Sequence, residues 1–361
     1  MGDQRNKRAG AIAVGILAAA GWLHGAAAGQ AVVPGPNGQI AFESSRDGTP
    51  DIFVMNSDGT IERNITRNGA TDVYPVWSPD GTKILFASDR AEPGNLDVWR
   101  MKADGSDPVR LTTTPGEDRG ASYTSDGAKI VFHSQRFRDA AHAFDLMTMN
   151  ADGSNQQLLV ANGSAGYVCG TSTTGVVVFN SAGNPLGTNP EGDFEIFSIR
   201  IDGTGLRQLT SNSVLDSGPK WSPDCASVSY NSLDAGGSLD VHRMNADGSG
   251  DTDLTNTPGV FDAFSAFSPD GQRIVFTSER GGIYEIYTMD AAGGGNVVQY
   301  TEAKQGDLHL RADWGTAADY DGPPTDKDQC RKDRWTEFSN PTFADQAQCV
   351  SYVVSGSISE N

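Results

Sequence analysis

The sequence predicts an all-β protein, a six-bladed β-propeller of four-stranded antiparallel blades. Three observations support this. A phrase ending in Ser-Pro-Asp-Gly, or a remnant of it, recurs at a period of about 43 to 50 residues. Each copy contains short β-type runs separated by tight-turn signals. The first and last copies are incomplete in complementary ways, as expected for a closed ring.

The strands of a copy follow one order. A β-type run such as "ILF" comes after a turn residue, and a second run such as "LDVWRM" follows it. An Asp-Gly turn such as "KADG" supplies the positive φ that a two-residue hairpin needs. A third short run such as "RLT" and a fourth lead into the next Ser-Pro-Asp-Gly turn. The turn residues before the first run are Gly38, Gly81, Gly127, Gly175, Cys225 and Gly271.

The phasing of the copies predicts how the ring closes. The first copy starts at its second strand, near Ile40, and the last ends with "LRADWGT", an innermost strand alone. Leu310 to Trp314 should therefore pair beside the strand at Ile40, so that one blade contains both ends of a propeller spanning residues 38–316.

The segments outside the propeller have their own signatures. Residues 1–31 have a basic start, an apolar stretch and small residues near Ala28, which predicts a signal peptide and a secreted, periplasmic or cell-envelope location. An uncleaved anchor is the alternative. Residues 317–361 form a polar linker and a short two-cysteine module that looks like those of secreted bacterial proteins, either a disulfide-closed surface staple or a partner-binding element.

The charge limits the partners. The chain carries 27 basic and 46 acidic residues, a net charge of -19. Without residues 1–31, which hold Asp3, Arg5, Lys7 and Arg8, 24 basic and 45 acidic residues remain, a net of -21. Such a charge disfavours nucleic acid and anionic membranes and is compatible with a soluble monomer or with cationic ligands.

The four cysteines predict two disulfides in an exported chain, although three connectivities exist. We expect Cys330 to pair with Cys349, which closes the tail. The second pair, Cys169 with Cys225, is the less secure of the two, since Cys225 replaces a turn glycine and its partner comes from the preceding blade.

A charge pattern flanks the hairpin turns. Residues nine before and nine after a turn glycine are Asp and Arg in several copies, which predicts cross-strand ion pairs that orient loops at the rim of the ring. The predicted pairs are Asp72 with Arg90, Asp118 with Arg136, Asp262 with Arg280 and, in the closing blade, Asp307 with Arg46.

Two copies break this pattern. The fourth has Gly166 on one side and Gly183 or Asn184 on the other, so both charges are missing. The fifth keeps Asp216 but has Asp234 in place of the arginine. Two facing carboxylates could bind a cation such as Ca²⁺, which prefers clustered oxygen ligands. The alternative is that both extend into solvent.

The loops that join runs such as "ILF" and "LDVWRM", which are the second and third strands of a blade, lengthen in the second to fourth copies. These loops lie on the face that carries the charged rim. Elaborated loops often carry function, which makes this sector a candidate partner-binding surface. Tolerated insertions at exposed turns are the other interpretation. The candidate binding residues are Arg136, Arg138, His142 and Asn184.

The phrase "WSPDG" with the following "F.S.R", "MNADG" and "LT" elements resembles the TolB-type, WD-repeat-like propeller motif over residues 38–316. The resemblance is to the propeller only, because no N-terminal α/β domain fits before Gly38. It implies an exported, non-enzymatic propeller that binds a protein or an envelope component. The alternative is a metal-assisted polysaccharide lyase or hydrolase at the channel mouth. A His, Asp and Glu cluster in the channel would favour the enzyme, and an apolar or hydroxyl lining would favour the binder.

Overall fold

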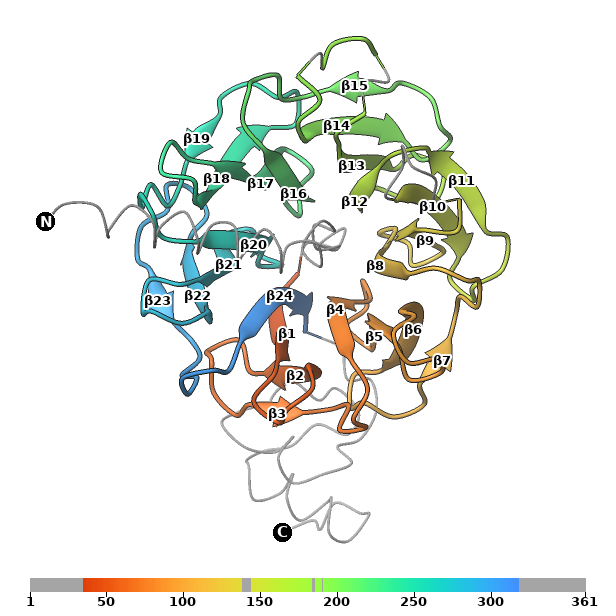
Figure 1. Cartoon of the computed structure of the whole chain (residues 1–361), viewed down its shortest axis with the longest axis vertical. Coiled ribbons are helices and arrows are strands. Elements are labelled where there is room, and N and C mark those ends of the chain that lie inside the picture. The colour runs from red at the N-terminus through yellow and green to blue at the C-terminus, as the bar shows by residue number, and fades with distance from the viewer. Residues whose placement is uncertain (1–34, 138–143, 184–185, 190, 318–361) are drawn as a thin grey trace, which may run out of the picture. The chain divides into compact units, whose positions relative to one another are not determined.

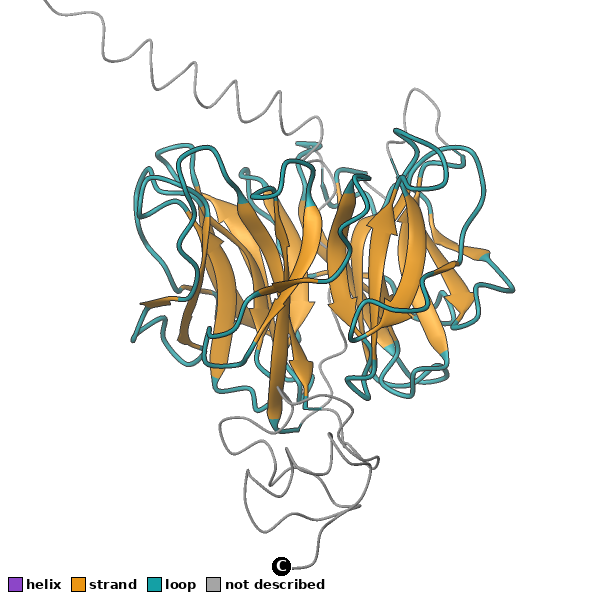
Figure 2. Cartoon of the chain, turned by 90° about the horizontal axis from the view of Figure 1, so that it is seen from below, coloured by secondary structure: helices purple, strands orange, loops and turns teal. Residues whose placement is uncertain are grey.

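The computed structural model describes residues 35–137, 144–183, 186–189 and 191–317. It shows six four-stranded antiparallel sheets around an axis (Figure 1), which confirms the predicted six-bladed propeller. The described part consists of strands, loops and turns (Figure 2), and it has no helix that could cross a membrane. The predicted signal peptide and the Cys330–Cys349 pair lie outside the described residues.

The blades follow one another along the chain, and the innermost strand of each blade precedes its other strands in the sequence, except in blade 1, where it comes last. Blade 1 consists of β24 (His309–Thr316), β1 (Asn37–Ser44), β2 (Asp51–Met55) and β3 (Arg63–Asn64); blade 2 of β4 (Asp72–Trp77), β5 (Lys83–Ser88), β6 (Asp97–Lys102) and β7 (Val109–Arg110); blade 3 of β8 (Asp118–Tyr123), β9 (Lys129–Ser134), β10 (Asp145–Asn150) and β11 (Gln157–Val160). Blade 4 consists of β12 (Ser164–Cys169), β13 (Val176–Ser181), β14 (Glu195–Arg200) and β15 (Arg207–Gln208); blade 5 of β16 (Asp216–Trp221), β17 (Ser227–Leu233), β18 (Leu239–Asn245) and β19 (Thr252–Asp253); blade 6 of β20 (Asp262–Phe267), β21 (Arg273–Ser278), β22 (Glu285–Asp290) and β23 (Val298–Gln299).

The strands are apolar on both faces because each blade packs between two others. In β5, Leu85 joins a core cluster with residues of blade 3, while Ile84 and Phe86 join a cluster with residues of blade 1. Successive side chains of a strand point to opposite faces, so neighbouring residues serve different blade interfaces. No blade can bury both of its faces alone, and stacking around the axis makes the core.

The ring closes as the sequence predicts. Strand β1 pairs with β24 in antiparallel fashion, and Ile40 lies opposite Trp314. The Trp314 indole Nε1 donates a hydrogen bond to the Gly38 carbonyl at 3.2 Å. Both ends of the propeller therefore belong to blade 1.

Every innermost strand has a bulge at its second or third residue, where φ lies between 49° and 61°. In five blades, a side chain from the second strand of the preceding blade accepts a hydrogen bond from the amide of this residue. Glu43 accepts from Tyr74, and His133 accepts from Ala165. These contacts tie neighbouring blades together near the axis. The bulge residues are Tyr74, Gly120, Ala165, Gly218, Phe264 and Arg311.

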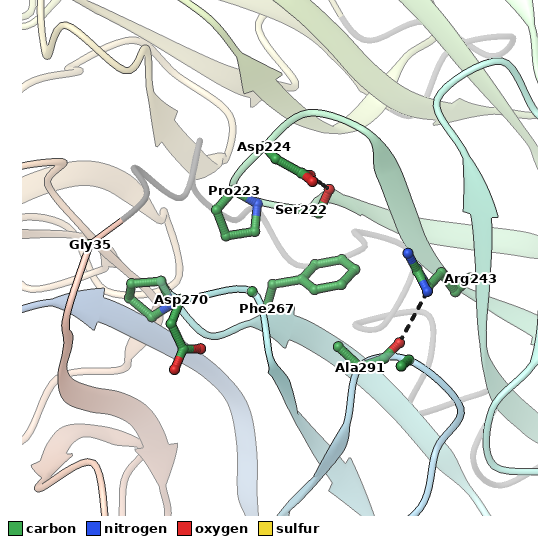
Figure 3. A pocket seen from close by; sticks show the side chains of 11 residues that line it. Gly35, Ser222, Pro223, Asp224, Arg243, Phe267, Asp270 and Ala291 are labelled. Atoms are coloured by element: carbon green, nitrogen blue, oxygen red, sulfur yellow. Dashed lines mark hydrogen bonds between the residues drawn. The ribbon is translucent and has the colours of Figure 1, made fainter.

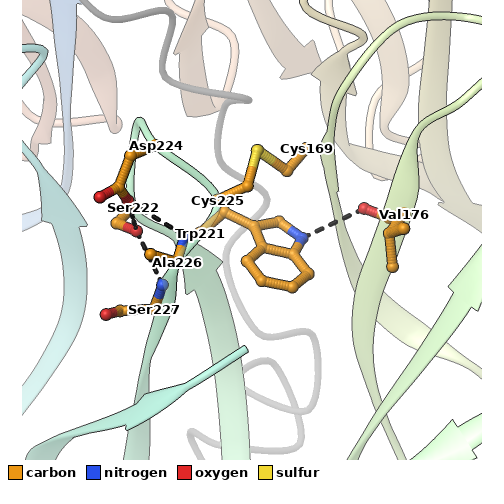
Figure 4. Close-up of a disulfide and its surroundings, with 8 residues drawn as sticks. All are labelled: Cys169, Val176, Trp221, Ser222, Asp224, Cys225, Ala226 and Ser227. Carbon is orange, nitrogen blue, oxygen red and sulfur yellow. Dashed lines mark hydrogen bonds between the residues drawn. A yellow bond between two sulfur atoms is a disulfide. The ribbon is translucent and has the colours of Figure 1, made fainter. Parts of the chain in front are cut away.

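A disulfide joins blades 4 and 5 (Figure 4), as the sequence led us to expect. The Cα atoms of Cys169 and Cys225 are 5.9 Å apart. Cys225 occupies a turn position with a φ of 60°, where most other blades have glycine. Beside the disulfide, the Trp221 indole donates a hydrogen bond to the Val176 carbonyl of blade 4 at 3.1 Å.

We expect Cys169→Ser to lower the free energy of unfolding by about 2–4 kcal/mol, because the bond closes a long loop. Adding Cys225→Gly should recover about 1 kcal/mol relative to Cys225→Ser, since glycine tolerates the left-handed φ. Urea unfolding of the wild type and the three variants measures both effects. Equal stability of the glycine and serine double variants would contradict the backbone part of this explanation.

Candidate functional site

The two ends of the strands define two faces of the ring. The loop face carries the loops between second and third strands, such as residues 89–96. The turn face carries the Ser-Pro-Asp-Gly turns at the other end. In the side view (Figure 2), loops cover both faces.

Three of the four predicted rim pairs are present on the loop face. The distances from arginine Nη2 to carboxylate oxygen are 2.9 Å for Arg90–Asp72, 3.0 Å for Arg136–Asp118 and 3.0 Å for Arg280–Asp262. The aspartate and the arginine are not directly opposite each other on the two strands, because Asp72 faces Ser88 in the register. The Arg90 guanidinium folds back over the Phe86 ring, and its Nε donates to Ser88 Oγ at 2.9 Å.

The predicted pair of Asp307 with Arg46 is wrong. The register places His309 opposite Ser44, so His309 takes the place of the rim aspartate in the closing blade. Arg46 Nη2 lies 3.0 Å from His309 Nε2, and Arg46 Nη1 pairs with Glu62. Because β24 and β1 come from opposite ends of the chain, no turn joins them. There is therefore no turn glycine from which to count nine residues in each direction.

Blade 4 also differs in detail from the prediction. Ser164 pairs with Asn180 where Val73 pairs with Ala87 in blade 2, so Gly163, not Gly166, stands at the aspartate position. The turn between β12 and β13 is longer than in blade 2, which shifts a count made from the turn glycine. Asn184 lies outside the described residues.

In blade 5 the two aspartates have different partners. Asp216 Oδ2 accepts a hydrogen bond from Asn212 Nδ2 at 2.8 Å, whereas Asp234 Oδ1 accepts from its own loop, at the Ser238 amide, at 2.7 Å. Burial raises the pKa of Asp216, although nearby hydroxyl and amide groups oppose this. Among the described residues, no group of three or more His, Cys, Asp or Glu side chains is arranged to hold a metal ion. Ca²⁺ binding by this pair stays a prediction.

The missing arginine of blade 5 coincides with a second exchange. Tyr230 and His242 stand where Phe86 and Trp99 stack on Arg90 in blade 2. Both bind Asp251: the Tyr230 hydroxyl donates at 2.7 Å, and His242 Nδ1 lies 3.1 Å away. In blade 2 the aromatic pair carries a stacked arginine. In blade 5 the Asp251 carboxylate is hydrogen-bonded to the equivalent pair instead.

Burial lowers the pKa of His242, but the hydrogen bond and charge of Asp251 outweigh it and leave that pKa raised. A histidine pKa that is higher in the folded than in the unfolded state stabilises the folded protein at pH values below the unfolded-state pKa of about 6.5. This stabilisation is lost as the pH rises through the folded-state pKa. We therefore expect the stability difference between the wild type and His242→Gln to shrink between about pH 6 and pH 8. Thermal unfolding over a pH series tests this, and Asp251→Asn should abolish the same dependence. A pH-independent difference would contradict it.

The elaborated loops carry exposed apolar side chains. Phe137, on the loop between β9 and β10, is 55% exposed, and Leu186, on the loop between β13 and β14, is 44% exposed. Arg136 is already engaged, because it pairs with Asp118 and donates to Gln156 Oε1 at 2.6 Å. The candidate residues Arg138 and His142 lie outside the described residues.

Three innermost-strand residues and Glu43, on the adjoining strand β1, are charged residues near the axis that the sequence analysis missed. Arg311 Nη1 lies 2.8 Å from Glu43 Oε2, and Lys220 Nζ lies 4.0 Å from Asp313 Oδ1, with all four side chains buried. Burial lowers the pKa of Lys220 to about 8, although Asp313 opposes the shift. The axis thus holds ion pairs, which match neither the acid and histidine cluster nor the apolar lining considered above. One signal was available for Arg311, because the equivalent residues in the other blades are Tyr74, Gly120, Ala165, Gly218 and Phe264, none of which is charged.

A pocket of about 290 Å³ lies on the turn face between blades 5 and 6 (Figure 3). Two of its polar side chains bind within the fold. Arg243 Nη1 donates to the Ala291 carbonyl at 3.4 Å, and Asp224 accepts from Ser222 at 2.5 Å. In blade 2, Arg100 makes the equivalent bond to the Ala151 carbonyl. The pocket therefore repeats the contacts that join other blades.

The six blades, the arginine rim and the asymmetric loop face define a closed six-bladed propeller with one elaborated sector. A family model described as the TolB beta propeller domain matches residues 21–184. The propeller of this chain is thus similar to the TolB beta propeller domain, over a stretch of a little under half of the chain.

Curated relatives match over short stretches. The chain is 41% identical over 64 residues to the protein TolB homolog of Chlorobium luteolum, and 38% identical over 52 residues to the Tol-Pal system protein TolB of Desulfosudis oleivorans. These stretches cover 17% and 14% of this chain, and 15% and 12% of the respective relatives.

Solved structures share the fold at low identity. TolB from Acinetobacter baumannii superposes with a TM-score of 0.62 and 16% identity, covering 77% of this chain and 67% of that one. A putative TolB from Agrobacterium tumefaciens gives 0.57 and 19%, covering 76% and 98%. Hydrazine synthase from Kuenenia stuttgartiensis gives 0.62 and 16%, covering 79% and 47%. Likeness at this level extends to the propeller fold alone.

Proposed function

We propose that this chain is an exported, non-enzymatic propeller that binds a protein component of the cell envelope through the loop face of blades 2 to 4. The observation that carries the proposal is the exposure of Phe137 and Leu186 on the longest loops of two neighbouring blades. Exposed apolar side chains grouped on one face mark interaction surfaces more often than isolated ones do. The break in the arginine rim at Gly163 falls in the same sector.

The similarity to TolB proteins supports a protein partner, since one relative is named as part of a Tol-Pal system. The predicted signal peptide supports export, and the two elements together favour the cell envelope. A partner with an apolar patch would bury Phe137 and Leu186, while the arginine rim would stay in place as a support for the loops.

The test compares three variants in a pull-down from the native cell envelope. One shortens residues 181–193 to the loop length of blade 6, and another changes Phe137 and Leu186 to serine. The third changes the turn-face residues Asn150 and Asn245 to serine as a matched control. We expect the first two to lose a set of proteins that the control retains. Equal loss of these proteins from the control variant would contradict the proposal that the loop face is the binding surface.

A further inference from the structure

Three buried side chains from blades 1 and 3 surround the ring of Tyr74, which lies on β4 of blade 2 between them. The guanidinium carbon of Arg311, on β24, lies 4.6 Å from the ring centroid, and that of Arg119, on β8, lies 5.5 Å from it. The His133 ring, on β9, stands perpendicular to it at 6.4 Å. We call Tyr74 and these three side chains the Tyr74 centre.

Each of the three carries a buried nitrogen without a hydrogen-bond partner: Arg119 Nε, Arg311 Nε and His133 Nε2. The residues are 3%, 7% and 0% exposed. The state of His133 follows from its other nitrogen, because Nδ1 accepts from the Ala165 amide at 2.9 Å and the neutral ring must then hold its proton on Nε2. Burial, and after it the charge of Arg119, hold the pKa of His133 well below its usual value, so the ring is neutral.

Two carboxylates among the described residues approach these arginines, and both already accept from nitrogens other than the three without a partner. Glu43 receives Arg311 Nη1 at 2.8 Å and the Tyr74 amide at 2.6 Å, and Glu117 pairs with Arg119 Nη1 at 3.1 Å. Burial raises the pKa of Glu43, and the charges of both arginines act against this rise. A buried donor without an acceptor is costly, so three of them in one place favour an acceptor from outside the chain.

We propose that the Tyr74 centre binds a carboxylate group. A carboxylate has two oxygens in the plane that guanidinium donors favour, and it accepts from a neutral imidazole N–H as well. Aromatic rings wall the centre, since Phe144 lies 4.5 Å from the Arg119 guanidinium and Phe264 lies 4.6 Å from that of Arg311. Such walls exclude water and strengthen the charge interaction. On an acidic molecule, this concentration of donors is also the part of the axis best suited to an anion.

The carboxylate can come from a small organic acid or from the end of a polypeptide, and the experiment separates the two. Isothermal titration calorimetry uses glutarate as one probe and an acetylated tripeptide with a free C-terminal carboxylate as the other, with its C-terminal amide as reference. We expect at least one carboxylate to bind, and the amide to bind more weakly by about tenfold or more. Equal binding of peptide acid and amide, or no heat from any probe at millimolar concentration, would overturn the proposal.

Arg119→Gln and Arg110→Gln form a matched pair of variants. Arg110 Nε is also buried without a partner, but Arg110 lies on the outer strand β7 and pairs with Asp97. We expect Arg119→Gln to weaken carboxylate binding by about tenfold or more and Arg110→Gln to leave it unchanged. In nitrogen NMR, the carboxylate should shift the His133 Nε2–H signal. Unchanged affinity in a folded Arg119→Gln variant, verified by circular dichroism, would contradict the proposal, and none of these outcomes depends on the loop residues of the proposed partner surface.

Discussion

Trp314→Ala should lower the free energy of unfolding by about 3–5 kcal/mol, as expected for removing a large buried aromatic side chain. Trp314 is 2% exposed and belongs to a core cluster shared by blades 1 and 6. It also lies on β24, the strand that closes the ring, and its indole binds the Gly38 carbonyl. Urea unfolding measures the change.

Trp221→Ala provides the control, because Trp221 holds the same position in blade 5 and is 3% exposed. It creates a comparable cavity without touching the closing blade. Any excess loss in Trp314→Ala therefore measures the contribution of closure. A loss below about 1 kcal/mol for Trp314→Ala would contradict the packing described for blade 1.

Arg311→Met should be comparably damaging, by about 3–5 kcal/mol, because it leaves the Glu43 carboxylate buried without its cation. Burial already raises the pKa of Glu43, and Arg311 is the largest influence that opposes the rise. The double variant Glu43→Gln/Arg311→Met should regain much of the loss, since glutamine carries no charge and can still accept from the Tyr74 amide. A double variant no more stable than Arg311→Met would show that the charge of Glu43 is not the cause.

The repeats made the fold predictable because turn chemistry is local. Ser-Pro-Asp-Gly and Asp-Gly turns mark strand ends wherever they occur, and the incomplete first and last copies indicated the pairing of β1 with β24. The rim pairs followed from counting around turn glycines. The count failed at His309 in the closing blade, where no turn glycine exists, and at Gly163, where the longer turn that follows β12 shifts the count.

The candidate sites were less predictable because they depend on which blades meet at the axis and which loops stay uncovered. Arg119, Arg311 and His133 are far apart in the sequence, and only the ring brings them to Tyr74. The exposure of Phe137 likewise depends on what its loop packs against. Sequence comparison among the copies did identify the elaborated sector, since the lengths of loops are visible without a structure.

Photo-crosslinking in the native cell most directly tests whether the loop face of blades 2 to 4 binds a protein partner. A crosslinking amino acid replaces Phe137 in one variant and Ile61 in another, because Ile61 is similarly exposed, at 51%, but lies just before the outer strand β3. We predict a discrete crosslinked product from position 137 that position 61 does not give and that shortening residues 181–193 abolishes. The same product from both positions, or none from position 137 in a folded protein, would contradict the proposed function.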